Sequence, residues 1–351
     1  MRVLVIQQKM IGDVLTSSIL FEALKEKYPN AELHYVLNKH TYPVVEHNPF
    51  IDEFLFVTPE IEKSKVAFYG FLKTIRHKNY DAVIDVYSKY SSNLMTLFSG
   101  AKLKISKRKW YTSIIYNHNY TDQKVKKTKA GLAIENRIQL LEPLHIKTSK
   151  LYKPKIHLTN KEITESKVFL QQSGIDLNKP IYMIGVLGSG MNKTYPFEYM
   201  AKVIDVIASE SKGQILFNYI PKQENNAKQI FDLCSAEAQN QIYFKVFGNS
   251  LRDFLAITHH CKALIGNEGG AINMAKAINI PTFTIFSPWI KKEVWSSFED
   301  DVQNVSVHLK DFKPHFFKNK DTRQLKAHWK TLYSEFEPDL LQAKLKKFVS
   351  S

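Results

Sequence analysis

The sequence predicts an α/β protein built from two Rossmann-like domains. Its 351 residues are many for a single hydrophobic core, and 44% of them are hydrophobic, which is ordinary for a globular chain. Strand-like and helix-like segments alternate through both halves, as in the βαβ units of parallel sheets. A polar segment with lysine and proline, residues 147–160, interrupts this alternation. We therefore place a domain boundary there.

Each half contains its own series of strands and helices. In the first half, strands are expected at residues 2–7, 32–37, 54–57 and 82–86, with a helix at residues 15–26. In the second half, strands are expected at residues 181–186, 214–219, 242–246, 263–266 and 282–286. Helices are expected between them at residues 161–172, 197–210, 224–234, 250–259 and 271–278. The tail, residues 324–349, has the pattern of an amphipathic helix that Pro338 should kink.

The chain is strongly basic, with a net charge of +15, and much of this excess lies in one segment. Between Lys102 and Lys129 there are nine lysines and arginines and one acid, Asp122, interleaved with aromatic residues such as Trp110 and Tyr111. Such a segment suits an acidic substrate, an anionic membrane surface or a nucleic acid, and a solvated basic loop is the plainer alternative. No nucleic-acid-binding signature accompanies it, so we expect no nucleic-acid partner.

Several classes of protein are disfavoured by the sequence. No segment approaches the roughly 18 apolar residues of a membrane span, and the apolar start resembles a buried strand more than a signal peptide. The two cysteines, Cys234 and Cys261, cannot form a disulfide framework. We therefore expect a cytoplasmic protein. No His, Cys, Asp or Glu residues show metal-ligand spacing, so no metal site is predicted, and His259 and His260 are expected to be structural or surface residues.

Three loops that follow predicted strands are candidates for chemistry, because ligands bind beyond the carboxyl ends of the strands in open α/β sheets. The first contains Gly12, which allows a close approach to the backbone, and Asp13, which is either a helix cap or a base. The second, residues 185–196, offers the backbone amides of Gly188, Ser189 and Gly190 and the charge of Lys193 to phosphate oxygens; a flexible loop is the alternative.

The third loop, residues 266–275, is the most specific. Its strand enters Gly269-Gly270, which opens a helix whose first amides can bind an anion; tight packing is the alternative role of the glycines. Glu268 would repel a phosphate and is better suited to accept hydrogen bonds from sugar hydroxyls. Two amide-rich loops and an acid in the other half therefore predict a nucleotide-sugar site.

In their order along the chain, these segments resemble glycosyltransferase family 9, the lipopolysaccharide heptosyltransferases. The resemblance includes Ile11-Gly12-Asp13, residues 80–85 leading to Ser91-Ser92, Lys193-Thr194-Tyr195-Pro196 and residues 266–288. It implies a GT-B fold, in which two Rossmann-like domains face a central cleft and a C-terminal helix packs back on the N-terminal domain. The expected domains are residues 1–155 with the helix at about 324–351, which bind the acceptor, and residues 175–315, which bind the nucleotide-sugar.

The resemblance also implies roles for individual residues. It implies an inverting transfer without an essential metal or other cofactor, in which Asp13 takes the proton of the acceptor hydroxyl. Ser189 and Lys193 match positions that hold the donor diphosphate. The donor side is expected to consist of Gly188, Ser189, Gly190, Lys193, Glu268, Gly269, Gly270 and Asn273. The acceptor side, which would receive an anionic lipopolysaccharide core or similar glycolipid near the inner membrane surface, is expected to include Gly12, Lys107, Arg108 and Lys109.

Three positions depart from the family pattern and leave the donor open. Glu268 and Gly269 stand where the family has Asp-Thr, and Asn273 stands where it has histidine. ADP-heptose is therefore one possible donor among several. A sugar epimerase of the same architecture and a nucleotide-sugar-binding protein without catalysis are the alternatives; Asp13 argues against the second, since a binder needs no carboxylate on the acceptor side.

Overall fold

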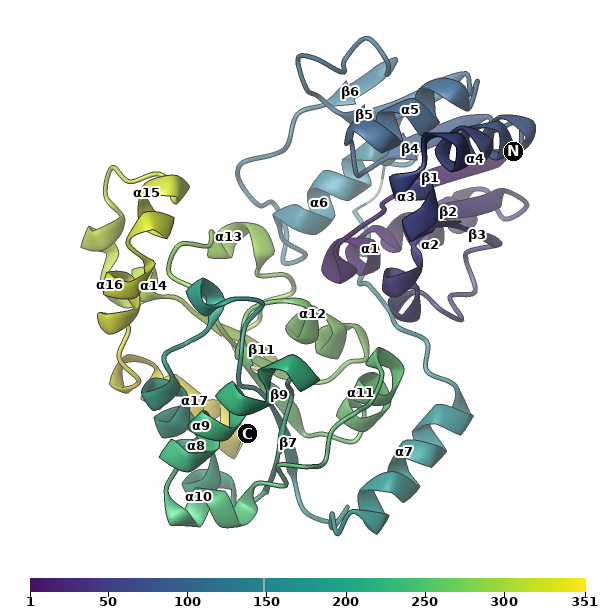
Figure 1. Ribbon diagram of the computed structural model, residues 1–351. Coiled ribbons are helices and arrows are strands. Elements are labelled where there is room, and N and C mark those ends of the chain that lie inside the picture. Colours follow the sequence, from purple (N-terminus) through teal and green to yellow (C-terminus); the bar gives the residue numbers. More distant parts are fainter. Residues whose placement is uncertain (148) are drawn as a thin grey trace. The chain divides into compact units, whose positions relative to one another are not determined.

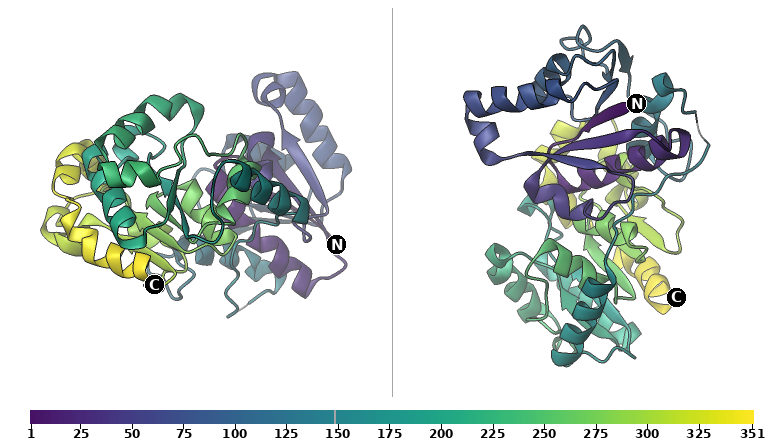
Figure 2. Two further views of the ribbon diagram at one scale, coloured as in Figure 1. Left: turned by 90° about the horizontal axis from the view of Figure 1, so that it is seen from below. Right: turned by 90° about the vertical axis from the view of Figure 1, so that its right-hand side faces the viewer.

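A computed structural model describes residues 1–147 and 149–351 of the chain. These residues divide into two compact units, Met1–His157 and Leu158–Ser351. Each unit contains a parallel β-sheet with helices on both faces (Figures 1 and 2). The predicted α/β class is therefore confirmed. Residue 148, which belongs to the predicted boundary segment, lies outside the described residues.

The first unit has the strand order β3-β2-β1-β4-β5-β6, which is the order of Rossmann domains. Its strands are β1 (Arg2–Ile6), β2 (Glu32–Asn38), β3 (Glu53–Val57), β4 (Ala82–Asp85), β5 (Leu103–Lys107) and β6 (His118–Tyr120). Its helices are α1 (Ile11–Ser17), α2 (Ile19–Lys27), α3 (Pro59–Lys63), α4 (Lys65–His77), α5 (Tyr90–Phe98) and α6 (Leu132–Ile138), with 3₁₀ turns η1 (Lys39–Val44) and η2 (Gln139–Leu144). Leu4 and Ile6 of the central strand form a core with Ile75 of α4 and Met95 of α5.

The second unit has the order β11-β10-β9-β7-β8, the flavodoxin-like variant of the doubly wound sheet. Its strands are β7 (Ile181–Gly185), β8 (Gln214–Phe217), β9 (Ala263–Asn267), β10 (Thr282–Ile285) and β11 (Asn304–Val307). Its longer helices are α7 (Asn160–Gln172), α8 (Phe197–Ser211), α9 (Glu224–Leu233), α11 (Leu251–Thr258), α12 (Gly270–Ala277) and α17 (Asp339–Ser350). Shorter ones are α10 (Ala236–Gln241), α13 (Lys292–Trp295), α14 (Leu309–Phe312), α15 (Thr322–Ala327) and α16 (Trp329–Ser334), with 3₁₀ turns η3 (Met191–Lys193), η4 (Pro221–Gln223) and η5 (Pro314–Phe317).

The strand at residues 242–246 is the one predicted strand that the structure contradicts. Ile242 makes an isolated bridge to Ile215, and the chain then turns, with the Val246 amide donating to the Tyr243 carbonyl. Conversely, β5 and β6 lie inside the basic segment between Lys102 and Lys129, for which no strand was predicted and a solvated loop was one alternative. The strand β5 was not predicted, because its two lysines interrupt the apolar pattern of a buried strand, although Ile105 and Ser106 are completely buried.

The C-terminal helix corrects a second prediction. We expected it to pack on the N-terminal domain, but α17 packs against α8 of the second unit (Figure 1). Its apolar face, which includes Leu341 and Leu345, joins the core around β7 and α8, and burying this face is what fixes the helix. Pro338 does not kink a continuous helix; it stands at the N-cap of α17, after α16 has ended. No helix in the described part of the chain is long and apolar enough to cross a membrane.

Within the second unit, a charged pair joins α7 to α11. The Arg252 guanidinium donates from Nε and Nη2 to the two carboxylate oxygens of Glu162, both at 2.6 Å. Glu162 also accepts the backbone amide of Thr159 at 2.7 Å and completes a capping box at the start of α7. The hydrogen bonds from Arg252, followed by those from Thr159, outweigh burial and lower the pKa of Glu162 to about 2.

We expect this pair to make stability depend on pH in acid. Because the pKa of Glu162 falls from 4.5 to about 2 on folding, its stabilisation is complete above 4.5 and is lost as pH falls toward 2. Glu162→Gln should lower the free energy of unfolding by about 1–2 kcal/mol near neutral pH. Urea unfolding of both proteins from neutral pH to pH 3 should show this difference shrinking. Glu165→Gln on the exposed side of α7 is the control, and a difference that does not change with pH would contradict the assignment.

Candidate active site

The candidate residues of the second unit lie at the point where its strand order reverses. β7 and β9 are neighbours at this switch point, and the loops after them carry Lys193 and Glu268. Doubly wound sheets bind ligands at such points, because the loops after the two strands run to opposite sides and leave a crevice between them. The topology therefore brings together the two loops that the sequence predicts as a phosphate site.

Close packing holds the loop after β7 in one conformation. A Cβ on Gly188 would lie 2.2 Å from the carbonyl oxygen of Lys193, so the turn requires glycine there. The Thr194 hydroxyl accepts the Gly188 amide and donates to the Gly190 carbonyl, both at 3.0 Å. Ser189 and Gly190 are exposed at the tip of the loop. The hydrogen bonds of Thr194 therefore hold the two ends of this exposed tip together.

Asn267, at the end of β9, ties this loop to the sheet. Its Oδ1 accepts the Tyr195 amide at 2.7 Å, and its Nδ2 donates to the carbonyls of Gly185 and Val186. Gly266 beside it has a φ of +148°, and a Cβ there would lie 2.4 Å from the Gly185 carbonyl oxygen. The ends of β7 and β9 can therefore approach this closely only with glycine at position 266.

Lys193 and Glu268 form an ion pair across the switch point. Nζ of Lys193 lies 3.1 Å from Oε1 of Glu268, whose side chain is 9% exposed. Nζ also lies 5.5 Å from the ring centre of Trp289, and the Trp289 indole is fixed by donating to the Asn192 carbonyl at 2.7 Å. Lys326 lies 4.9 Å from the centre of the same ring. Glu268 and Trp289 therefore hold the ammonium group of Lys193 beside the glycine-rich turn.

The N-terminus of α12 opens next to this pair. Gly269, the N-cap, has a φ of +146° and provides no side chain for capping, and Gly270 is exposed. The amides of the first helical turn point away from the helix and carry its positive dipole end. Asn273 is half-buried one turn into α12. The arrangement offers an anion both backbone donors and a cation.

In the first unit, Asp13 lies in the first turn of α1, after the central strand β1. It does not cap this helix, because the N-cap is Met10, which has a φ of 67°. Instead, Oδ1 of Asp13 accepts a hydrogen bond from Nη2 of Arg137 at 2.8 Å. Arg137 is itself fixed, since its Nε donates to the Ser17 hydroxyl at 2.9 Å and its Nη1 to the Ala133 carbonyl at 2.7 Å. Among the described residues, Oδ2 of Asp13 has no hydrogen-bond partner, so one carboxylate oxygen is anchored and the other is available.

The acceptor-side lysines and arginine lie at the end of β5 and in the loop after it, at the same sheet edge as α1. Lys107 ends β5, and the exposed Arg108 donates its amide to the Tyr120 carbonyl at 2.6 Å. Nζ of Lys109 donates to the Ser88 carbonyl in the loop after β4, and burial together with the charge of Lys89 lowers the pKa of Lys109. Gly12 accepts the Thr16 hydroxyl through its carbonyl oxygen at 2.6 Å.

A buried carboxyl group lies beneath these loops. Asp85, at the end of β4, accepts the Ser88 amide at 2.7 Å and lies 2.6 Å from the hydroxyl of Tyr116. Complete burial raises the pKa of Asp85 despite these hydrogen bonds. Asp85 therefore holds the loops after β4 and β5 through Ser88 and Tyr116, and its buried carboxyl group does not contact a substrate.

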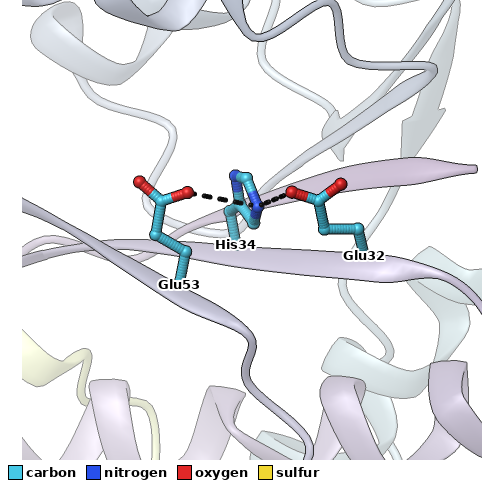
Figure 3. A group of neighbouring side chains, drawn as sticks. All are labelled: Glu32, His34 and Glu53. Atoms are coloured by element: carbon cyan, nitrogen blue, oxygen red, sulfur yellow. Dashed lines mark hydrogen bonds and ion pairs between the residues drawn. The ribbon is translucent and has the colours of Figure 1, made fainter.

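A second group of acids meets at the opposite, amino end of the sheet. Figure 3 shows His34 of β2 between Glu32 and Glu53, with its Nε2 2.8 Å and 3.4 Å from their oxygens. Residue spacing along the chain does not reveal this cluster, because Glu53 comes from the neighbouring strand β3. Arg2 pairs with Glu32 and Lys78 with Glu53, each at 2.7 Å. Since both carboxylates already have cationic partners, we assign the cluster to holding the strand ends together. His260 is also structural, with Nε2 3.0 Å from the Ser166 hydroxyl.

Two Rossmann-like units, one of which presents a lysine and a helix N-terminus at its switch point, define a glycosyltransferase of the GT-B class. The chain belongs to glycosyltransferase family 9 (heptosyltransferase), whose model matches residues 68–324. The predicted GT-B fold and glycosyltransferase class are thus confirmed.

Known relatives of the chain include several heptosyltransferases. Lipopolysaccharide heptosyltransferase 1 of Campylobacter coli is 24% identical over 82% of this chain and 84% of its own length. Lipopolysaccharide heptosyltransferase 2 of Escherichia coli K12 is 21% identical over 82% and 83%.

Solved structures share the fold over nearly the whole chain. A family 9 glycosyltransferase from Veillonella parvula superposes with a TM-score of 0.72 at 16% identity, covering 95% of this chain and 97% of that one. E. coli heptosyltransferase WaaC with ADP-2-deoxy-2-fluoro heptose gives 0.67 at 17% identity, covering 96% and 99%.

Proposed function

We propose that the protein is an inverting glycosyltransferase that moves heptose or a related sugar from a nucleotide-sugar to a lipopolysaccharide core or similar glycan. The main support for this proposal is the ion pair of Lys193 and Glu268 at the switch point, beside the open N-terminus of α12. A cation and helix amides suit a diphosphate, and an acid suits sugar hydroxyls. Membership of the heptosyltransferase family supports the same donor class.

On the acceptor side, Asp13 is proposed as the base. As the acceptor oxygen attacks the anomeric carbon, its O–H bond breaks and the proton passes to the carboxylate of Asp13. Arg137 anchors Oδ1, which leaves Oδ2 to take this proton. Gly12 allows the acceptor to approach the backbone, and Lys107, Arg108 and Lys109 supply charge for an anionic glycan.

On the donor side, the bond between the anomeric carbon and the diphosphate oxygen breaks as the new bond forms. Its electron pair stays on the departing nucleoside diphosphate. Lys193 and the amides of Gly270 and its successors stabilise this growing negative charge, and the exposed backbone of Ser189 and Gly190 contributes further donors, while buried Gly188 shapes the turn that presents them. These protein groups provide the charge stabilisation, so we propose a reaction without an essential metal.

The donor sugar depends on the residues around Glu268. Glutamate is one methylene longer than the aspartate of the family pattern, Gly269 supplies no hydroxyl, and Asn273 replaces an imidazole with an amide. The WaaC structure shows that ADP-2-deoxy-2-fluoro heptose binds a protein of this fold. We propose ADP-heptose as the first donor to test, with other nucleotide-sugars beside it.

The test measures nucleotide release from a panel of nucleotide-sugars, with and without a lipid A-core acceptor. We expect one donor to be turned over only when acceptor is present, in EDTA as well as in magnesium. Product analysis should show an inverted anomeric linkage. If nucleotide binds but no donor is turned over, the protein is a nucleotide-sugar-binding protein and the catalytic proposal is wrong.

A further inference from the structure

The loops that leave β5 and β6 expose apolar side chains among positive charges. Because these strands are parallel neighbours, residues 108–117 and 121–131 emerge at the same edge of the sheet. Trp110 is 88%, Ile114 90% and Val125 75% exposed. Single exposed apolar residues are common on proteins, but several of them in adjacent loops at one edge mark an interaction surface.

The loop after β5 is held firmly, so this exposure is a property of the fold. Thr112 and Tyr116 are 2% and 3% exposed, and the Tyr116 hydroxyl lies 2.6 Å from buried Asp85. The chain makes one turn before Thr112, where the Thr112 amide donates to the Lys109 carbonyl, and a second between the two anchors, where the Ile115 amide donates to the Thr112 carbonyl. The Trp110 ring packs edge-on to Tyr111, with centroids 5.5 Å apart. The anchored loop therefore presents Trp110 and Ile114 outward.

Positive charge surrounds these side chains. The exposed cations of the two loops are Arg108, Lys124, Lys126, Lys127 and Lys129. Two acids lie nearby: Asp122 in the loop, and Glu135, whose carboxylate accepts the amides of Lys127 and Thr128. Five cations against two carboxylates leave this surface with a clear positive excess.

We propose that this surface, formed by residues 108–114 and 124–129, docks on an anionic lipid bilayer, with Trp110 and Ile114 entering the headgroup region. Cations attract an anionic leaflet, while a tryptophan and aliphatic side chains gain from the interface below the headgroups. A nucleic acid would use the cations and the aromatic rings, but Ile114 and Val125 would gain nothing from phosphates or base faces. Docking would bring the proposed glycolipid acceptor to the sheet edge that carries Asp13. The inference rests on the proposed function only for this purpose.

The experiment is vesicle flotation of the full chain without donor or acceptor, so its outcome does not depend on turnover. Phosphatidylcholine vesicles are compared with vesicles that also contain phosphatidylglycerol, at low and high salt. We expect binding to the anionic vesicles only, weakened by salt. Trp110→Ala/Ile114→Ser should weaken it by about tenfold or more, and Lys124→Gln/Lys126→Gln/Lys127→Gln should weaken it similarly.

Val66→Ser/Val302→Ser is the matched control, because both valines are exposed elsewhere, by 83% and 62%, and this variant should bind as the wild type does. Tryptophan emission should shift to shorter wavelength with anionic vesicles in the wild type and not in Trp110→Ala. Binding that is insensitive to salt, or unchanged in the Trp110/Ile114 variant, would overturn the proposal. So would tighter binding of a single-stranded oligonucleotide through these same residues.

Discussion

Asp13→Asn will reduce turnover by about 10²- to 10⁴-fold while leaving the affinity for the donor unchanged, since a positioned general base contributes that much to a transfer step. Asparagine has the same shape as aspartate but cannot accept the acceptor proton. Its side-chain oxygen can still accept the hydrogen bond from Arg137, so the local fold should persist. Initial rates with donor and acceptor, together with titration of the nucleotide alone, separate the chemical step from binding.

Two further variants make this result specific. Arg137→Gln removes the guanidinium that anchors Asp13 and should cost less than Asp13→Asn, because the base remains but is less well oriented. Glu60→Gln, at an exposed acid at the start of α3, should have no effect. Unchanged turnover in Asp13→Asn would remove Asp13 from the mechanism. A large loss of thermal stability in that variant would show that its pairing with Arg137 is structural.

The prediction of the fold succeeded where local patterns are strong. Apolar runs such as that of β1 are buried on both faces of a parallel sheet and leave an unambiguous signal. It failed where burial depends on distant partners. Residues 103–107 include two lysines although β5 lies between β4 and β6 in the sheet, and the sequence around Leu341 and Leu345 does not indicate whether α8 or another surface will cover them.

The site, too, could be predicted where local patterns are strong and not where it depends on distant partners. Glycines and amide-rich loops after strands are visible in a sequence, because close approach of backbones demands them, as at Gly188 and Gly266. Partners that come from elsewhere are not visible. Arg137 lies 124 residues from Asp13, and Trp289 meets Lys193 only through the fold. No clear signal was available for the first of these, because Arg137 is one of three polar residues in the short helix α6.

Lys193→Ala should lower kcat/KM by about 10²- to 10³-fold, the range lost when one group that stabilises developing charge is removed. Unlike Asp13→Asn, it should also weaken binding of the free nucleoside diphosphate. Part of the loss of nucleotide affinity in Lys193→Ala would come from Glu268 rather than from the missing ammonium group. Glu268, 9% exposed, would be left without its cation, and an unpaired carboxylate there repels the diphosphate.

The double variant Lys193→Ala/Glu268→Gln separates these contributions. Nucleotide affinity should recover in it, because the unpaired charge is gone, whereas turnover should stay low, because nothing replaces the ammonium group at the leaving oxygen. Lys326→Ala is the matched control, since Nζ of Lys326 lies 4.9 Å from the centre of the same Trp289 ring but, among the residues that the structure describes, forms no ion pair with Glu268. If turnover recovers together with affinity, Lys193 serves only to neutralise Glu268, and the stabilisation of the leaving group must come from the amides of α12 alone.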